Sequence, residues 1–185
     1  MDHADHVRLL CDGVAASAGV WADIGAGEGA FTLALADLLG PGARIVAVDR
    51  NGGALRANGA AVAARFPATQ LETLVADLTR PLALPVLDGL VAANSLHFVA
   101  RGRQVEVVRS LAEHLRPGGA FIVVEYDADR GNPWVPHPFS ARSWERMALE
   151  AGLEPAREIG RVPSRFLGAI YASVSRRTSA DASEG

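Results

Sequence analysis

The sequence predicts an α/β protein whose mostly parallel sheet carries helices on both faces. Short runs of residues that are apolar throughout alternate with helix-like segments up to about residue 126. Such strands are typical of parallel sheets that are buried on both faces. After residue 126, two strand candidates follow each other without a helix between them. Neighbouring strands joined by a short connection are normally antiparallel, so the sheet is expected to end in an antiparallel hairpin.

The first part of the chain is expected to hold three helices and three strands. Val7, Leu10 and Val14 have helical spacing, which predicts that the chain begins with a helix. In chain order, the expected elements are a helix over about 4–18, a strand over 19–24, a helix over 28–40, a strand over 43–49, a helix over 51–66 and a strand over 70–77.

The second part of the chain is expected to begin with a loop and to end in the hairpin. The segment "LTRPLALPV" over 78–86 holds two prolines, which predicts a loop or at most one helical turn. Ser140 or Ser143 is a suitable N-cap for the last helix. The remaining expected elements are a strand over 87–94, a helix over 103–119 that is stopped by Pro117, Gly118 and Gly119, a strand over 120–127, a proline-rich loop over 128–139, a helix over 140–152, and strands over 153–160 and 166–177.

Length and composition favour one globular domain. The chain has 185 residues, of which 49% are hydrophobic and 21% are charged, and this suits a single domain with a sizeable core. We expect the domain over 1–176, with an N-terminal helix or lid element over 1–19 and a flexible tail over 177–185. No apolar run approaches the ~20 residues of a membrane helix, and the N-terminus lacks a signal-peptide pattern, which predicts a cytoplasmic protein.

Residue usage excludes several kinds of chemistry. All 18 basic residues are arginine, so Schiff-base chemistry and a P-loop lysine are excluded. Cys11 is the only cysteine, which excludes an internal disulfide and a zinc cluster built on thiolates. The arginines are scattered among acids at a formal net charge of −3, without the basic stripe of a nucleic-acid-binding protein. No cluster of carboxylates and histidines suggests a metal site.

The segment "WADIGAGEGAF" over 21–31 predicts a nucleotide-binding turn between a strand and a helix. Glycines let the backbone approach a ligand, and free N–H groups at a helix start favour negative charge. Read loosely, Gly25-x-Gly27-x-x-Ala30 satisfies the dinucleotide fingerprint, so an NAD(P)-dependent oxidoreductase stays open. The alternative is a tight strand-to-helix turn without a ligand.

Carboxylates follow the second and third expected strands, at the edge of a parallel sheet where ligands bind. Asp49 ends the second strand, where it is placed to accept hydrogen bonds from ribose hydroxyls. Asp77 ends the third strand, where it can accept a hydrogen bond from an exocyclic adenine amine. The alternative for both residues is a cap on the turn that follows the strand.

Four segments in order resemble the class I S-adenosylmethionine-dependent methyltransferases. These segments are "VWADIGAGEGAF", "IVAVDRN", "VADL" and "LRPGG", and the resemblance covers about residues 7 to 175. It implies a Rossmann-like, doubly wound, mostly parallel seven-stranded sheet with a C-terminal antiparallel hairpin. The chain is similar to the small, cap-less members that act on small molecules or quinones. The family's third helix is reduced here to 78–86. An NAD(P)-dependent oxidoreductase and a non-catalytic S-adenosylmethionine-binding subunit remain alternatives.

The resemblance also implies which residues hold S-adenosyl-L-methionine, whose product is S-adenosyl-L-homocysteine. The acid of the glycine loop would lie near the ammonium group, and the loop backbone against the methionine part. The acid after the second strand would hold the ribose, and the acid after the third strand, with the next N–H, would hold adenine. Asn94 would lie near the ribose or the amine. The expected cofactor-binding residues are Asp23, Gly25, Ala26, Gly27, Asp49, Arg50, Asp77, Leu78 and Asn94.

The segment "NSLHFV" over 94–99 limits the methyl acceptor. It lacks the two prolines that follow this strand in adenine-N6 and glutamine methyltransferases, and it lacks the cysteine nucleophile of a cytosine-C5 enzyme. Nucleic acid is therefore not expected as the acceptor, and a small molecule is. The sequence leaves open whether oxygen, nitrogen or carbon is methylated, and which oligomeric state the protein has.

A few side chains are candidates for the acceptor pocket. His97 is a catalytic candidate, because a base is needed when the acceptor must lose a proton. The alternative is a structural histidine whose ring forms hydrogen bonds with backbone groups. Glu125 is expected either to face the cleft or to pair with an arginine. The expected pocket residues are His97, Tyr126, Trp134 and His137, and the proline-rich loop that carries the last two is expected to act as a lid.

Overall fold

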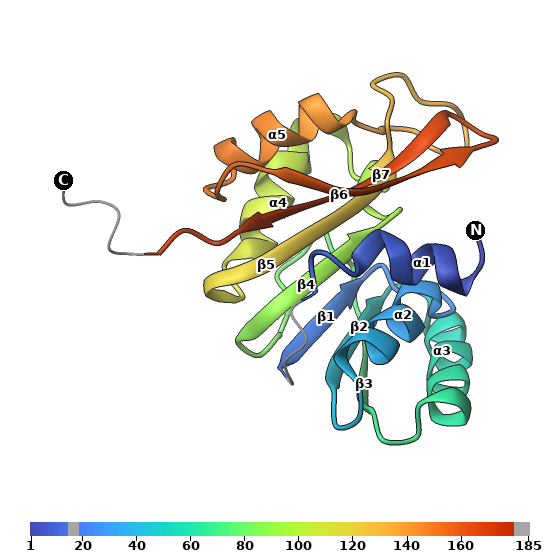
Figure 1. The fold of residues 1–185 in the computed structure, drawn as a ribbon. Helices are drawn as coiled ribbons and strands as arrows, with labels where there is room; N and C mark the ends of the chain where they lie inside the picture. Colours follow the sequence, from blue (N-terminus) through green and yellow to red (C-terminus); the bar gives the residue numbers. More distant parts are fainter. Residues whose placement is uncertain (15–18, 180–185) are drawn as a thin grey trace.

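The computed structural model describes residues 1–14 and 19–179, and these form one seven-stranded sheet between two layers of helices (Figure 1). The strand order is β3-β2-β1-β4-β5-β7-β6. The first five strands are parallel, whereas β7 is antiparallel to both β5 and β6. The predicted fold class and its terminal hairpin are therefore confirmed. The strands are β1 (Val20–Ile24), β2 (Arg44–Asp49), β3 (Gln70–Val75), β4 (Leu87–Ala93), β5 (Leu115–Tyr126), β6 (Arg157–Ser164) and β7 (Gly168–Arg176).

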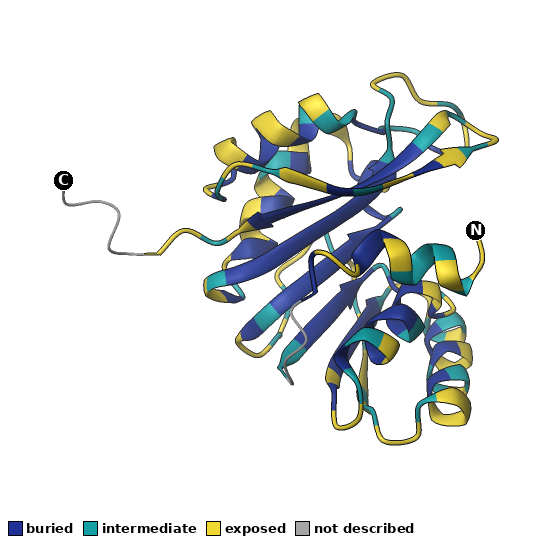
Figure 2. Ribbon diagram, in the orientation of Figure 1, coloured by how far each residue is buried: buried dark blue, intermediate teal, exposed yellow. Residues whose placement is uncertain are grey.

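The helices cover both faces of the sheet and form a separate apolar core with each face. One core lies under α1, α2 and the neighbouring strands, where Leu10, Leu35 and Ile122 are fully buried. The other lies under α4 and α5, where Val108, Phe121 and Trp144 are buried. Figure 2 shows the buried strands between helices whose outer faces are exposed. The helices are α1 (His3–Leu10), α2 (Ala30–Leu39), α3 (Gly52–Arg65), α4 (Gln104–Ala112) and α5 (Ala141–Glu150), with short 3₁₀ turns η1 (Leu96–Phe98) and η2 (Arg101–Arg103).

A loop takes the place of the helix that would connect β3 to β4, as the two prolines of 78–86 predict. Leu78, Leu82 and Leu84 from this segment pack against the core under α4 and α5. The apolar side chains of a loop therefore cover the part of the sheet that a third helix would cover. The loop begins at the carboxyl end of β3, at the sheet edge where the site is expected.

The prediction of a helix over 103–119 was wrong at its C-terminal end. The helix α4 ends at Ala112, and the Pro117-Gly118-Gly119 segment belongs to β5. Gly118 N–H donates to the Arg177 carbonyl at 2.9 Å, and Arg177 N–H donates to the Gly119 carbonyl at 3.0 Å. The pairing with β4 shifts register between Leu87 and Gly89. Because these residues hydrogen-bond to Arg177, directly after β7, they form the irregular beginning of β5 and not the end of a helix.

The two chain ends only partly match the prediction. The first helix ends at Leu10, and 15–18 of the expected helix over 4–18 lie outside the described residues.

The strand β6 begins at Arg157, later than the predicted 153. Pro163 is tolerated in β6 because this is an edge strand, where a missing N–H breaks no second ladder. The last part of the expected tail, 180–185, also lies outside the described residues.

A buried polar network ties β1 to α2 and α3 beneath the glycine turn. The Thr32 hydroxyl donates to the Asp23 carboxylate at 2.6 Å, and the Asn58 amide donates to Thr32 Oγ1 at 2.8 Å. Asp23 is 1% exposed. Burial raises the pKa of Asp23 to about 7, with a smaller contribution from the Asp49 charge and an opposing one from the Thr32 bond.

The core under α5 generates a prediction about stability. Trp144 is fully buried, with its ring centroid 5.5 Å from that of Phe121 and 5.9 Å from that of Phe139. We expect Trp144→Ala to lower the free energy of unfolding by about 3–5 kcal/mol, because a large cavity replaces the indole. Trp134, which is 77% exposed, is the matched control, and Trp134→Ala should change stability by less than about 0.5 kcal/mol. Urea unfolding measures both, and equal losses would contradict the assignment of the core.

The buried Asp23 carboxyl predicts a pH dependence of stability. Its pKa is about 7 in the folded protein and 3.8 in the reference state, so the folded state holds the proton more tightly between these values. Stability should therefore fall as pH rises from about 4 to about 7 and then level off, by up to about 4 kcal/mol from this group. Asp23→Asn cannot ionise, so it should gain stability relative to the wild type over this range in urea unfolding. The exposed Glu145→Gln on α5 is the control, and parallel pH curves for Asp23→Asn and wild type would refute the assignment.

Candidate functional site

A cavity of about 540 Å³ lies at the carboxyl ends of β1, β2, β3 and β4. The strand order reverses here, because β1 pairs with β2 on one side and with β4 on the other, and this is where open parallel sheets bind ligands. The volume suits a ligand of cofactor size. The lining residues are Gly25, Gly27, Val48, Asp49, Arg50, Asn51, Ala54, Ala76, Asp77, Leu78, Thr79, Asn94, Ser95, Phe98 and Val99.

The glycine turn is held against the neighbouring strands by its own backbone. Gly25 and Ala26 N–H groups both donate to the Val48 carbonyl, at 2.8 and 2.9 Å. Gly25 has φ +79°, and a Cβ there would lie 2.4 Å from Ser95 Cβ, so only glycine fits. Gly27 has φ +52° and open space where a Cβ would be. The turn therefore presents backbone without bulky side chains to the cavity. The three N–H groups of residues 25 to 27 already donate hydrogen bonds within the protein.

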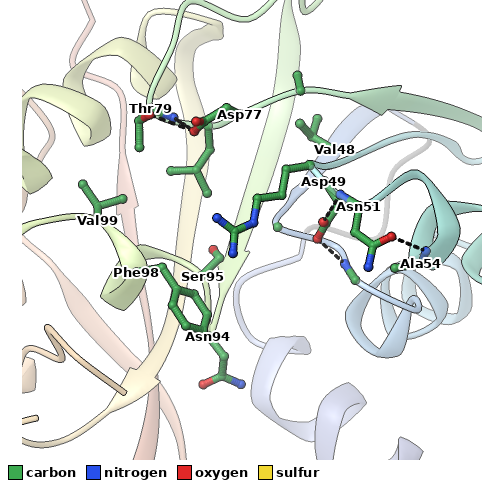
Figure 3. A pocket seen from close by; sticks show the side chains of 15 residues that line it. Val48, Asp49, Asn51, Ala54, Asp77, Thr79, Asn94, Ser95, Phe98 and Val99 are labelled. Atoms are coloured by element: carbon green, nitrogen blue, oxygen red, sulfur yellow. Dashed lines mark hydrogen bonds between the residues drawn. The ribbon is translucent and has the colours of Figure 1, made fainter. Parts of the chain in front are cut away.

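Asp49 joins the glycine turn to the end of β2. One carboxylate oxygen accepts from Gly27 N–H at 2.9 Å, and the other accepts from Asn51 N–H at 2.8 Å. Asn51 in turn caps α3, since its side-chain oxygen accepts from the N–H groups of Gly53 and Ala54. Figure 3 shows Asp49 and Asn51 on the same side of the cavity. Each carboxylate oxygen can accept a further hydrogen bond from a ligand.

Asp77 and Thr79 form a second polar wall, at the start of the loop after β3. The Asp77 carboxylate accepts from Thr79 N–H at 2.9 Å and from the Thr79 hydroxyl at 2.8 Å. These bonds hold the pKa of Asp77 below its usual value, and the charges of Arg80 and Arg50 act in the same direction. The carboxylate is therefore ionised at neutral pH. Figure 3 shows Asp77 and Thr79 together, across the cavity from Asn94 and Phe98.

Asn94 and Ser95 follow β4 and bring unpaired polar atoms to the cavity. Asn94 has φ +50°, and among the described residues no other non-glycine residue has a positive φ. Its N–H donates to the Val124 carbonyl at 2.8 Å, which holds the turn against β5. Asn94 Oδ1 and Ser95 Oγ are buried and have no hydrogen-bond partner among the described residues. Such atoms need an explanation, and a polar ligand supplies one.

Two of the predicted cofactor residues do not line the cavity. Asp23 lies beneath the glycine turn, where its carboxylate accepts from Thr32. Ala26 is 8% exposed and contributes its N–H to the bond with Val48. The structure brings the other seven predicted residues to one cavity. Sequence reasoning missed Ser95, Asn51, Thr79, Phe98 and Val99, of which Ser95, Phe98 and Val99 belong to the quoted "NSLHFV" segment.

His97 and Glu125 form a buried pair where β4 and β5 end. His97 Nδ1 lies 2.9 and 3.0 Å from the two Glu125 carboxylate oxygens. Glu125 Oε1 also accepts from Tyr126 N–H at 2.8 Å. His97 is 3% exposed and Glu125 is fully buried. The partner of Glu125 is therefore a histidine, and not the arginine that the sequence left open.

The predicted lid loop is fixed at its ends and exposed at its centre. Asp129 accepts from the Ser140 N–H and hydroxyl, at 3.0 and 2.9 Å. The Arg101 guanidinium donates to the carbonyls of Asp129 and Pro138, and His137 N–H donates to the His97 carbonyl at 3.0 Å. Trp134 lies in solvent. The loop therefore begins beside the site, although Trp134 and His137 do not line the cavity.

Two other properties of the described residues bear on function. Within the ranges 1–14 and 19–179, no three or more His, Cys, Asp or Glu side chains converge as ligands to a metal ion would. In the same ranges, no helix has the length and hydropathy needed to cross a membrane.

Solved structures of methyltransferases share this fold. The 1,6-didemethyltoxoflavin-N1-methyltransferase of Burkholderia thailandensis, whose structure contains 1,6-didemethyltoxoflavin and S-adenosylhomocysteine, is 19% identical over 88% of this chain and 72% of its own, with a TM-score of 0.72. An S-adenosylmethionine-dependent methyltransferase of Aquifex aeolicus is 17% identical over 93% of this chain and 89% of its own, with a TM-score of 0.71. A third, an S-adenosylmethionine-dependent methyltransferase of Methanosarcina mazei, is 15% identical over 90% of this chain and 95% of its own, with a TM-score of 0.69.

The family comparison agrees with the fold and the cavity. A search of curated proteins gave no significant match. The family model described as "Methyltransferase domain" matches residues 22–121, which is more than half of the chain and runs from β1 into β5. The predicted class, an S-adenosylmethionine-dependent methyltransferase, is confirmed, and the chain belongs to the methyltransferase domain family.

Proposed function

We propose that this protein methylates a small organic molecule and that it binds its cofactor in the 540 Å³ cavity. The observation that carries the proposal is the convergence on one cavity of the Asp49 and Asp77 carboxylates and two buried atoms, Asn94 Oδ1 and Ser95 Oγ, that have no hydrogen-bond partner within the described part of the chain. S-adenosylmethionine supplies a methyl group on a sulfonium, which is an electrophile that a nucleophilic atom of the acceptor can attack directly.

The lining residues suit the separate parts of this cofactor. Asp49 is placed to accept from the ribose hydroxyls, with Arg50 beside it. Asp77 and the N–H of Leu78 are placed to hold adenine. Gly25 and Gly27 leave room for the methionine part, and Asn94 and Ser95 offer oxygens to its ammonium. The remaining predicted contacts are those of Ala26 and of Asp23, whose carboxylate would stabilise the ammonium from below the turn.

Charge and loop geometry favour a cationic cofactor over a dinucleotide. The cavity is lined by two carboxylates and one guanidinium, and a bound cation gains from nearby carboxylates. A pyrophosphate would instead need free N–H groups at the glycine turn. Those of Gly25, Ala26 and Gly27 are all used within the protein. This argues against the NAD(P)-dependent alternative.

The acceptor is proposed to be a small molecule that binds beside the methionine end of the cavity. His97, Tyr126, Trp134 and His137 are the residues proposed to surround it. The related fold of the Burkholderia enzyme, which is named for a small heterocyclic substrate, supports a small acceptor, as does the absence of a basic stripe in the sequence. The cytoplasmic location and the lid function of the 128–139 loop stay predictions.

The cofactor assignment predicts a difference between two ligands. The purified protein should bind S-adenosylhomocysteine with micromolar affinity, and it should bind NAD weakly or not at all, because the turn offers no free pyrophosphate-binding N–H at residues 25 to 27. Calorimetric titration with each ligand measures this. Tight binding of NAD, without a response to S-adenosylhomocysteine, would overturn the proposed cofactor site.

Asp49 is predicted to be the most sensitive residue of the cofactor site. Asp49→Ala should weaken S-adenosylhomocysteine binding by about 2–3 kcal/mol, the scale of a lost charge-assisted hydrogen bond whose partner is left unpaired. Asp49→Asn, which keeps an acceptor for the Gly27 or Asn51 N–H, separates loss of charge from loosening of the turn. Calorimetry gives the affinities and thermal unfolding checks the fold. Asp37→Ala, an exposed carboxylate on α2, is the control. An unchanged affinity in a folded Asp49→Ala protein would show that the ribose is held elsewhere.

A further inference from the structure

The His97–Glu125 pair is a buried ionisable cluster that cofactor binding does not explain. Glu125 is 0% exposed, and His97 Nδ1 faces both of its carboxylate oxygens at 2.9 and 3.0 Å. Within residues 1–14 and 19–179, the hydrogen bonds to this carboxylate come from His97 and from the Tyr126 N–H. Neither His97 nor Glu125 lines the cofactor cavity.

Stability alone gives little reason to keep such a pair. Burying a carboxylate is costly, and an apolar pair of similar volume is often as stable or more so. The neighbouring positions of β5, from Phe121 to Val124, are apolar and fully buried, so the sheet packs here without polar groups. A buried ionisable pair that stability does not require is a candidate for a functional role.

The pair lies beside the end of the cavity that Ser95 lines, which the proposed function assigns to the methionine part. His97 belongs to η1, and Phe98 directly after it and Ser95 two residues before it line the cavity. The His97 ring centroid lies 4.3 Å from that of Phe98 and 6.0 Å from that of Tyr126. Because Glu125 occupies Nδ1, the nitrogen left to meet an acceptor is Nε2, which has no hydrogen-bond partner among the described residues.

The side chains around this end of the cavity indicate an aromatic acceptor. Phe98 is 59% exposed although it lines the cavity. Trp134, in the loop whose backbone is bonded to that of His97 through His137, is more exposed still, although it does not line the cavity. An exposed aromatic ring that lines a binding cavity, as Phe98 does, suits the face of a planar apolar ligand.

We propose that His97 Nε2 is the general base of the reaction, that Glu125 is its positioning residue, and that the acceptor is a hydroxyl on an aromatic ring. This inference rests on the proposed function. The acceptor O–H proton moves to Nε2 as the oxygen bonds to the methyl carbon. The carbon–sulfur bond breaks with its electron pair going to sulfur, and the proton then leaves to water. An amine attacks through its lone pair before it loses a proton, so a hydroxyl is the acceptor for which a base in this position matters most.

The first test measures directly which ring nitrogen of His97 carries the proton, and it requires no methyl acceptor. Nitrogen NMR of protein labelled at histidine, with S-adenosylhomocysteine added, should show His97 with a proton on Nδ1 and none on Nε2 at neutral pH. Glu125→Gln should remove this fixed tautomer, because its carboxamide can also donate to the ring. A His97 ring protonated on both nitrogens, or on Nε2 alone, would overturn the proposal, because no lone pair would then face the acceptor.

The second test compares two acceptors that differ in their need for a base. The assay is run at about pH 8.5, where phenol, like a tyrosine side chain, still carries its proton, whereas 4-nitrophenol is almost fully ionised. The wild type should methylate both when S-adenosylhomocysteine release is followed. His97→Asn and Glu125→Gln should lose phenol turnover by about 10²-fold or more and should keep 4-nitrophenol turnover within a few-fold. Equal losses on both phenols, no loss on either, or a wild type that accepts neither phenol would overturn the proposal.

Controls separate this inference from the proposed function. Calorimetry should show that both variants bind S-adenosylhomocysteine as the wild type does. His114→Asn changes a histidine just before the other end of β5, and should leave turnover of both phenols unchanged. If a Glu125 variant fails to fold, the two His97 variants, to Asn and to Gln, decide the question. A wild type that does not bind S-adenosylhomocysteine would refute the proposed cofactor site. Normal binding of S-adenosylhomocysteine, combined with a phenol test that contradicts the expectation, would refute only the role of His97 as base.

Discussion

The carboxylate of Asp49 is the contact on which the proposed cofactor site depends. It accepts one N–H from the glycine turn, at Gly27, and one from Asn51, which itself caps α3. This carboxylate thus links the glycine turn, which also bonds through its backbone to Val48, to the start of α3. Asp49 also lines the cavity. We therefore expect the residue that fixes the glycine turn to contact the ligand as well.

Much of this arrangement can be predicted from sequence because it follows from local patterns. Buried parallel strands leave uninterrupted apolar runs, and a residue at the end of such a run must lie at the ligand-binding edge of the sheet. Asp49 and Asp77 are therefore found from strand ends, whereas Asn94 is expected only from the family resemblance. The proline pair of 78–86 likewise predicts the loop that replaces a helix, since proline ends helices through its own geometry.

The features that escaped prediction depend on partners far away in the chain. His97 and Glu125 are 28 residues apart and meet only because β4 and β5 are neighbours. The contact of Gly25 with Ser95 joins the ends of β1 and β4 in the same way. Pro117-Gly118-Gly119 looks like a helix stop, yet hydrogen bonds to Arg177 make it part of β5. Local propensity contains no information about these pairings.

The loop after β3 serves both the core and the cavity, and this links folding to the ligand. Its first residues, Asp77, Leu78 and Thr79, line the cavity, while Leu78, Leu82 and Leu84 cover the sheet. A segment without a helix of its own opens at lower free energy than the strands it covers. A ligand that contacts it therefore protects that side of the sheet against local opening and protease attack. A cofactor bound in this cavity would thus contribute to the stability of the folded protein as well as to its chemistry.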